Sequence, residues 1–73
     1  MKLDELVPGQ RARISKIAAE KSLRRRLMDM GLTRGAPIEL LKAAPLGDPL
    51  EFRVRDYHLS LRKAEACLIE IEV

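Results

Sequence analysis

Apolar and polar residues alternate along most of this chain, a pattern typical of short β-strands with one buried face. The alternating segments run from Gln10 to Ile17, Pro37 to Ala43, Leu50 to Arg55, Tyr57 to Arg62 and Ile69 to Val73. Residues that favour turns, such as Pro8, Gly9 and Asp56, separate them. Five short strands in 73 residues favour a small barrel, because closure removes the exposed edges of a small sheet. The order of the strands does not follow from the pattern.

The apolar positions of the strands identify the expected core. Phe52 lies in the middle of the third strand and is expected to be buried, and Leu41 indicates a bulge or a partly covered second face in the second strand. The alternating residues of the last two strands are expected to point into the core: Tyr57, Leu59, Leu61, Ile69, Ile71 and Val73. A brief helical turn at Lys63–Cys67 connects these two strands. The predicted fold is therefore mostly β.

One segment has the helical rather than the strand period. Three apolar residues fall at i, i+4 and i+7 after the first strand: Leu23, Leu27 and Met30. Ser22 occupies the position expected for an N-cap, and Gly31 that of the left-handed residue that ends a helix. Leu32 follows as the apolar residue that folds back over the helix end. The sequence therefore predicts one short α-helix, from about Leu23 to Met30, inserted after the first strand.

Basic residues are concentrated in the first strand and the helix. The chain carries a net charge of +3, and residues 10–34 hold eight Lys or Arg against two acids. Residues 64–73 hold three acids and no base. Such a basic surface suits nucleic acid, anionic lipid or an acidic protein partner, and an ordinary solvated face is the alternative.

The chain has few residues suited to catalysis or metal binding. It contains one cysteine, Cys67, and one histidine, His58, so neither a disulfide nor a metal cluster is expected. No nucleophile and acid stand at a spacing from His58 that suggests a catalytic set, so we expect no enzyme and no cofactor. Asp56 and His58 lie two positions apart and offer two ligands, which makes only a weak metal site. Cys67 is expected to be a small buried apolar residue.

Length and the lack of long apolar segments limit the organisation of the chain. No linker or repeat divides residues 1–73, so one domain is expected. No apolar run approaches the ~18 residues of a membrane span, and Asp4 and Glu5 interrupt the segment where a signal peptide would be apolar. We therefore expect a soluble cytoplasmic protein. A domain this small is marginally stable, so weak homo-oligomerisation is left open.

Four sequence blocks together resemble the FeoA family. They are RRLMDMGLTRG from Arg25, LGDP from Leu46, LSLRKAEA from Leu59 and the closing IEIEV. The resemblance covers nearly the whole chain. It implies an SH3-like barrel and a cytoplasmic companion of the FeoB ferrous iron permease, a membrane protein with a GTP-binding domain. It thus implies a non-enzymatic regulatory protein of ferrous iron uptake that acts by protein contact at the inner face of the membrane.

The predicted helix offers a candidate contact surface for such a partner. At about 100° per residue, Met28 lies off the apolar stripe, between Arg24 and Arg25. An exposed apolar side chain beside arginines is typical of protein interfaces, whereas the alternative is that Met28 fills a gap beside a loop. Leu46, at the tip of the loop after the second strand, is a second exposed candidate. We therefore predict a partner-binding patch of Arg24, Arg25, Met28 and Leu46.

Two other functions remain open from the sequence. A nucleic-acid-binding barrel could use Arg11, Arg13 and the run Arg24–Arg26 as a phosphate track. The chain has only one Phe and one Tyr, which leaves little for stacking on bases. A metal-sensing module could use Asp56 and His58.

Overall fold

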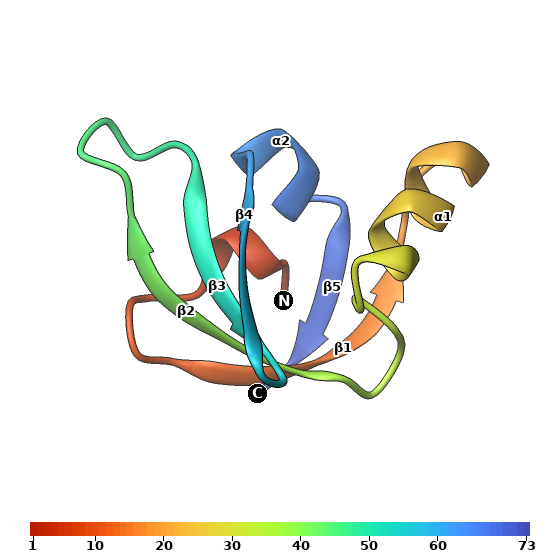
Figure 1. Ribbon diagram of the computed structural model, residues 1–73, viewed down its shortest axis with the longest axis horizontal. Coiled ribbons are helices and arrows are strands. Elements are labelled where there is room, and N and C mark those ends of the chain that lie inside the picture. Colours follow the sequence, from red (N-terminus) through yellow and green to blue (C-terminus); the bar gives the residue numbers. More distant parts are fainter.

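The alternating segments pair into one antiparallel sheet of five strands in the order β4-β3-β2-β1-β5. The computed structural model describes residues 1–73. Its elements, in chain order, are the 3₁₀ helix η1 (Leu3–Glu5), β1 (Arg11–Ile17), α1 (Lys21–Asp29), β2 (Pro37–Ala43), β3 (Leu50–Val54), β4 (Tyr57–Leu61), α2 (Lys63–Ala66) and β5 (Ile69–Glu72). Figure 1 shows the strands curling around a common interior, with α1 at one side and α2 above β4 and β5. The predicted fold class and the five strands are confirmed.

Residues that face each other across the strands form rows inside the curled sheet. Ile38 faces Val54, and Leu40 faces Phe52. The core contains 17 buried residues, all of them apolar, and Phe52 is completely buried, as predicted. The register of β2 against β3 shifts around Leu41, which confirms the bulge.

The two edges of the sheet depart from the alternation pattern. β4 pairs only with β3, so Tyr57 is 40% exposed and Leu59 is half-buried, while Leu61 alone is fully buried. At the other edge, β5 ends at Glu72, and Val73 is 76% exposed because it lies beyond the last paired residue. The predictions that Tyr57 and Val73 belong to the buried core are therefore wrong.

Helix α1 begins at Lys21, two residues before the predicted start at Leu23, because Glu20 and not Ser22 caps it. The Glu20 carboxylate accepts hydrogen bonds from the backbone N–H of Leu23, at 2.8 Å, and from the Ser22 hydroxyl. Ser22 therefore supports the cap from within the first turn of the helix. An acceptor at this position satisfies one of the backbone donors that a helix start leaves free.

The end of α1 follows the predicted pattern. Gly31 has a φ of +95°, the left-handed conformation that glycine adopts without steric cost. Its N–H donates to the carbonyl of Met28 at 2.9 Å, and the N–H of Leu32 donates to the carbonyl of Leu27 at 3.2 Å. This pair of bonds is the Schellman motif, which brings apolar residues at the two outer positions together. Leu27 and Leu32 are completely buried, so the helix end is anchored in the core.

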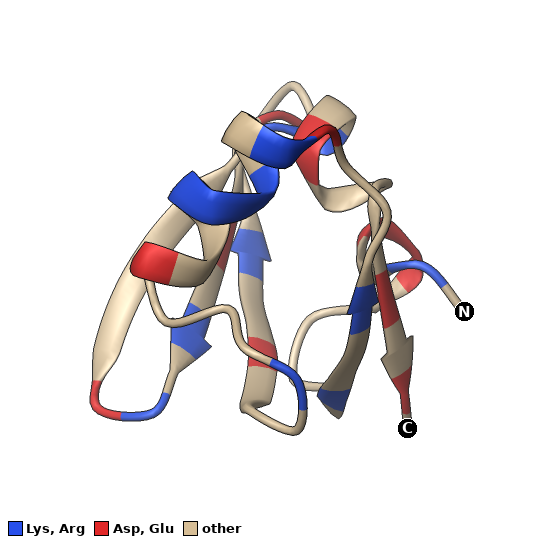
Figure 2. Cartoon of the chain, turned by 90° about the vertical axis from the view of Figure 1, so that its right-hand side faces the viewer, with Lys and Arg blue, Asp and Glu red and all other residues tan.

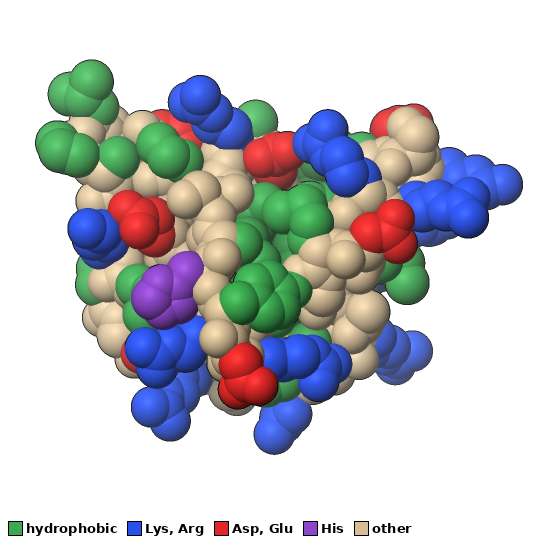
Figure 3. All heavy atoms as spheres, in the orientation of Figure 1, with side chains coloured by type: hydrophobic (Ala, Val, Ile, Leu, Met, Phe, Trp, Pro, Cys, Tyr) green, Lys and Arg blue, Asp and Glu red, His purple; other side chains and the backbone are tan.

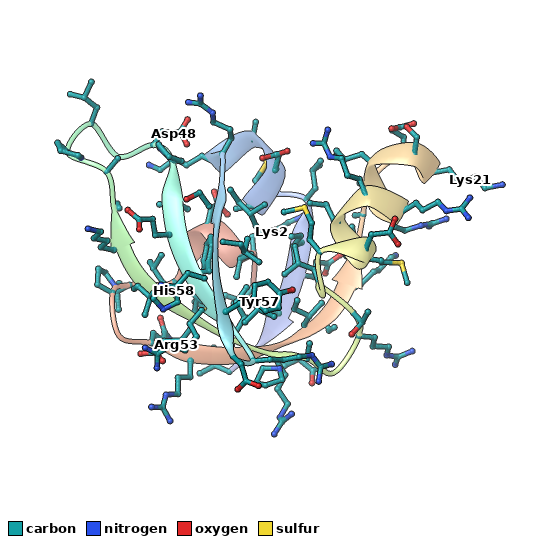
Figure 4. The ribbon with its side chains drawn as sticks, in the orientation of Figure 1. Lys2, Lys21, Asp48, Arg53, Tyr57 and His58 are labelled. Atoms are coloured by element: carbon teal, nitrogen blue, oxygen red, sulfur yellow. The ribbon has the colours of Figure 1, made fainter.

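The turn between β3 and β4 reaches the same helix end. It consists of Arg55, with a φ of +55°, and Asp56, which confirms the tight turn predicted at Asp56. Tyr57 then extends its ring to Gly31, where an added Cβ would overlap the Tyr57 hydroxyl. Figure 4 shows the labelled Tyr57 pointing from β4 towards α1. No strand pairs with the free edge of β4. The Tyr57 ring therefore fills the gap between β4 and α1.

Side-chain contacts attach both helices to the rest of the domain. Arg26 donates to Glu65 at 2.8 Å in an ion pair that joins α1 to α2. Asp48 accepts from the backbone N–H of Lys63 at 2.9 Å, so the β2–β3 loop is fixed to the start of α2. Cys67 follows α2 and is half-buried rather than buried. None of the helices has the length and apolar composition needed to cross a membrane.

Candidate functional site

The outer side of α1 carries three of the four residues predicted to bind a partner. The predicted apolar stripe is confirmed, because Leu27 is buried and its two companions are partly buried against the core. Arg24, Arg25 and Met28 occupy the surface that remains, and Met28 is 46% exposed although its side chain is large and apolar. Figure 2 shows basic residues following one another along this helix.

Met28 and Arg24 stand between two hollows. One, of about 250 Å³, lies between α1 and β1, and its walls include Ile17 and Leu32. The other, of about 400 Å³, lies along α1 itself and includes Arg25. Met28 and Arg24 line both. A side chain between two hollows can insert into a partner while groups of the partner fill the space on either side, which is the arrangement of an interface anchor.

The cap of α1 determines the charge of Glu20 at the start of the helix. Hydrogen bonds from the Ser22 hydroxyl and the Leu23 N–H hold the pKa of Glu20 below its ordinary value. The carboxylate therefore stays ionised at neutral pH, at the helix end where negative charge is favourable.

Arg24 and Arg25 form no ion pair within the protein. Their charges are available to acidic groups of a partner.

Leu46 lies apart from the three α1 residues. It is 96% exposed in the loop between β2 and β3. Figure 1 shows this loop and α1 at opposite ends of the long axis, which extends 31 Å, and the labels of Asp48 and Lys21 in Figure 4 mark the two ends. In Figure 3 apolar side chains gather at the loop end and basic side chains at the α1 end. The structure thus brings three members of the predicted patch together and leaves Leu46 as a separate exposed residue.

Three of the five arginines in the alternative phosphate track form an ion pair or a hydrogen bond within the protein. Arg11 pairs with Glu39 at 3.5 Å. Arg13 donates to a backbone carbonyl in the loop before β2 at 3.0 Å, and Arg26 pairs with Glu65. The track is therefore interrupted between β1 and α1, which weakens the structural case for nucleic acid.

A second group of arginines is not evident from the sequence. Alternation places Arg53 and Arg55 on the outer face, but only the strand order shows that β2 alone separates β3 from β1 and Arg11. These three arginines line one hollow of about 240 Å³. The contact of Tyr57 with Gly31 is equally invisible in the sequence, because it joins distant segments whose spacing carries no shared pattern.

The weak metal pair gains no further ligand from the fold. β4 begins at Tyr57, so Asp56 lies in the turn, where strand alternation does not align it with His58. His58 is exposed and faces Arg53 on the neighbouring strand. No group of three or more His, Cys, Asp or Glu side chains is placed to hold a metal ion. Asp56 and His58 therefore stay weak candidates for metal binding.

The chain is similar to known proteins of ferrous iron transport. The FeoA domain model matches residues 1–73. A fusion protein of Fe(2+) transport protein A and the Fe(2+) transporter FeoB from Porphyromonas gingivalis is 38% identical over 73 residues, which is 100% of this chain. The chain spans 9% of the length of that relative, so the likeness concerns one segment of a much larger protein.

Solved structures show the same fold. The solution NMR structure of the FeoA protein from Chlorobium tepidum is 48% identical and aligns with a TM-score of 0.94, over 100% of this chain and 70% of that one. The crystal structure of Stenotrophomonas maltophilia FeoA complexed with zinc is 26% identical, with a TM-score of 0.82 over 99% of this chain and 89% of that one. That protein is described as an SH3 domain protein, which confirms the expected SH3-like fold.

Proposed function

Because this chain belongs to the FeoA domain family, we propose that it is a non-enzymatic accessory protein of ferrous iron uptake. It docks on a FeoB-type permease from the cytoplasmic side and regulates the permease through protein contacts. Two comparisons support this role. One relative joins the same domain to FeoB in a single polypeptide, and the Stenotrophomonas maltophilia protein is described as a candidate ferrous iron transport activating factor. Fusion of two domains in one protein favours contact between their separate counterparts in another.

The exposed methionine of α1 carries the proposal. Leu27 anchors the helix in the core, so we expect the fold to tolerate a change at Met28. Complete burial of a methionine side chain contributes about 1.5 to 3 kcal/mol, and Met28 still exposes 46% of its surface. Arg24 and Arg25 beside it match the apolar centre and charged rim that protein interfaces share. We therefore assign the primary contact to Arg24, Arg25 and Met28.

Leu46 is a secondary contact in this proposal. Its loop lies at the other end of the long axis from α1, so a small partner bound to α1 does not reach it. The chain amounts to 9% of the fusion relative, and a permease of that size is large enough to touch both ends. Loss of Leu46 is therefore expected to weaken binding less than loss of Met28.

Co-purification of tagged protein with solubilised native membranes tests the proposal. The wild type is compared with an Arg25→Glu, Met28→Asp variant at ~150 mM salt, where exposed charges are already screened. A Lys2→Glu, Val7→Asp variant is the matched control, because it makes the same changes of charge and polarity at exposed positions outside both α1 and the β2–β3 loop. We expect the wild type and the control to retain an iron permease and the α1 variant to lose at least about 90% of it.

The outcomes show separately whether the kind of partner and the contact surface are correct. Equal retention by the α1 variant and the wild type would remove α1 from the contact. Retention of nucleic acid without a permease would favour the phosphate-binding alternative. Circular dichroism and thermal melting of each variant establish that the comparison is made between folded proteins.

A further inference from the structure

The outer face of the sheet contains a hollow that the proposed docking surface does not use. It lies where β1, β2 and β3 run side by side, has a volume of about 240 Å³ and is lined by Arg11, Pro37, Ile38, Glu39, Arg53 and Arg55. We name it the sheet groove. Three arginines and a single carboxylate make its lining basic, and none of its residues belongs to α1.

The strand register explains why these charges meet. Arg11 faces Glu39, Glu39 faces Arg53, and Arg53 faces His58, so the four residues form one row across four strands. Side chains directly opposite each other have Cβ atoms only about 4.5 to 5.5 Å apart. Figure 4 shows the labelled Arg53 and His58 next to each other on the same side of the sheet. The row contains one acid among its basic residues.

The only acid of the row, Glu39, has its ion-pair partner at the β1 end of the row. Glu39 forms its ion pair with Arg11, at 3.5 Å, and its side chain is 21% exposed. Arg53 and Arg55 form no ion pair and are both exposed. Their two guanidinium groups therefore carry positive charge that nothing in the protein neutralises, at the rim of a concave surface. Concentrated charge of one sign in a hollow attracts a ligand of the opposite sign.

The shape and composition of the groove favour carboxylates presented by a protein segment. Guanidinium groups bind carboxylates through two parallel hydrogen bonds. The groove has no aromatic lining residue on which a nucleic acid base could stack. Because it is concave, a protruding peptide segment enters it more easily than the flat surface of a membrane meets it.

We propose that the sheet groove binds an acidic peptide segment of a protein partner. Arg53 and Arg55 hold the carboxylates of the segment, while the pair of Arg11 and Glu39 closes the other end of the groove. This site is independent of the α1 contact, because the two surfaces share no residue. Failure of either proposal leaves the other intact.

NMR titration of the complete ¹⁵N-labelled protein tests the groove. The probe is a short acetylated peptide of alternating Glu and Gly, added at ~50 mM salt, where exposed charges interact strongly. We expect saturable shifts at residues 11, 38, 39 and 53–55, and an Arg53→Glu, Arg55→Glu variant that binds at least about tenfold more weakly. A Lys2→Glu, Lys63→Glu variant changes the net charge equally at exposed positions outside the groove and is expected to stay within about threefold of the wild type.

Several results would overturn the proposal. They are the absence of saturable binding at ~50 mM salt, shifts centred on α1, and equal loss of affinity in the two variants. Vesicles containing phosphatidylserine and a single-stranded oligothymidylate serve as competing probes. Tighter binding of either one, dependent on Arg53 and Arg55, would assign the groove to lipid or nucleic acid instead of an acidic peptide.

Discussion

Arginines mark two surfaces of this protein, and the surfaces differ in what surrounds them. On α1, Arg24 and Arg25 lie beside an exposed methionine. In the sheet groove, Arg53 and Arg55 lie beside a carboxylate, and no large apolar side chain of the lining is exposed. In the two proposals, the same residue type thus forms the rim of an apolar contact on one surface and the groups that bind carboxylates on the other.

The difference determines how each surface responds to its surroundings. Burial of apolar area depends little on moderate salt, whereas exposed ion pairs are screened beyond about 10 Å at 0.1 M salt and are individually weak. The α1 surface is therefore expected to give affinity that persists at physiological salt. The sheet groove is expected to give charge selectivity and a strong dependence on salt.

The largest effect is expected from Gly31→Ala, which disrupts the support of the α1 surface. The φ of +95° strains any other residue, and the new Cβ would overlap the Tyr57 hydroxyl. Together these effects are expected to lower the free energy of unfolding by about 2 to 4 kcal/mol, measured by urea denaturation. Gly35→Ala is the control, because Gly35 has a similar φ of +85° but nothing within 4 Å of the added Cβ, and about 1 kcal/mol is expected there. Equal losses in the two variants would show that Tyr57 does not restrict this position.

The next effect is expected from Met28→Ala, which removes the apolar centre of the α1 surface and keeps its arginines. Because only the exposed 46% of the side chain remains for a partner to bury, affinity for the permease is expected to fall about 3-fold to 10-fold, or ~0.7 to 1.4 kcal/mol. The free energy of unfolding is expected to change by less than about 1 kcal/mol. Pull-down with graded concentrations and urea denaturation measure the two quantities. A large loss of stability would mean that Met28 packs within the fold and is not an anchor.

Salt concentration is expected to affect binding at the two surfaces to different extents. Between about 50 and 300 mM sodium chloride, binding of the acidic peptide to the sheet groove is expected to weaken about tenfold. Permease retention through α1 is expected to fall by less than about threefold over the same range, because burial of Met28 contributes most of it. Equal salt dependence of the two interactions would indicate that charge dominates both.

The smallest effect concerns the start of α1. Because folding lowers the pKa of Glu20, its carboxylate contributes stability above the ordinary pKa range of a glutamate, and this contribution is lost as pH falls through the lower folded pKa. The melting temperature of the wild type is therefore expected to fall more between pH 7 and acidic pH than that of Glu20→Gln. Ser22→Ala removes one of the two hydrogen bonds to the Glu20 carboxylate and is expected to give a pH dependence between those of the wild type and Glu20→Gln. An unchanged pH dependence in Glu20→Gln would contradict the assigned cap.

Local patterns in the sequence were sufficient for much of the fold. The spacing of Leu27 and the position of Gly31 predict the helix and its end, because the periodicity and the left-handed residue are properties of neighbouring positions. The helix start is different, since Ser22 and Glu20 both offer oxygen acceptors and only the backbone path decides which one reaches the N–H of Leu23. The exposure of Tyr57 likewise depends on β4 being an edge strand, which is a property of the complete sheet.

For the candidate sites too, some neighbouring residues are predicted by local patterns and others depend on the complete fold. Helix geometry predicts Arg24, Arg25 and Met28 as neighbours, because all three lie within two turns of one helix. It does not predict that Leu46 lies at the far end of the molecule, nor that Arg53 faces Glu39, because both depend on the order and register of strands. Surfaces built within one element are therefore visible in this sequence, and surfaces built across elements are not.

The ring of Tyr57 over Gly31 gives the protein an internal optical reporter. The chain contains one tyrosine and no tryptophan, so its tyrosine emission arises at a single point, the gap between β4 and α1. Any movement of α1 away from the hairpin changes the surroundings of that ring, and no brighter chromophore of the chain obscures the change. Separation of the helix from the sheet can therefore be followed by fluorescence without a label, in the same sample in which folding is measured.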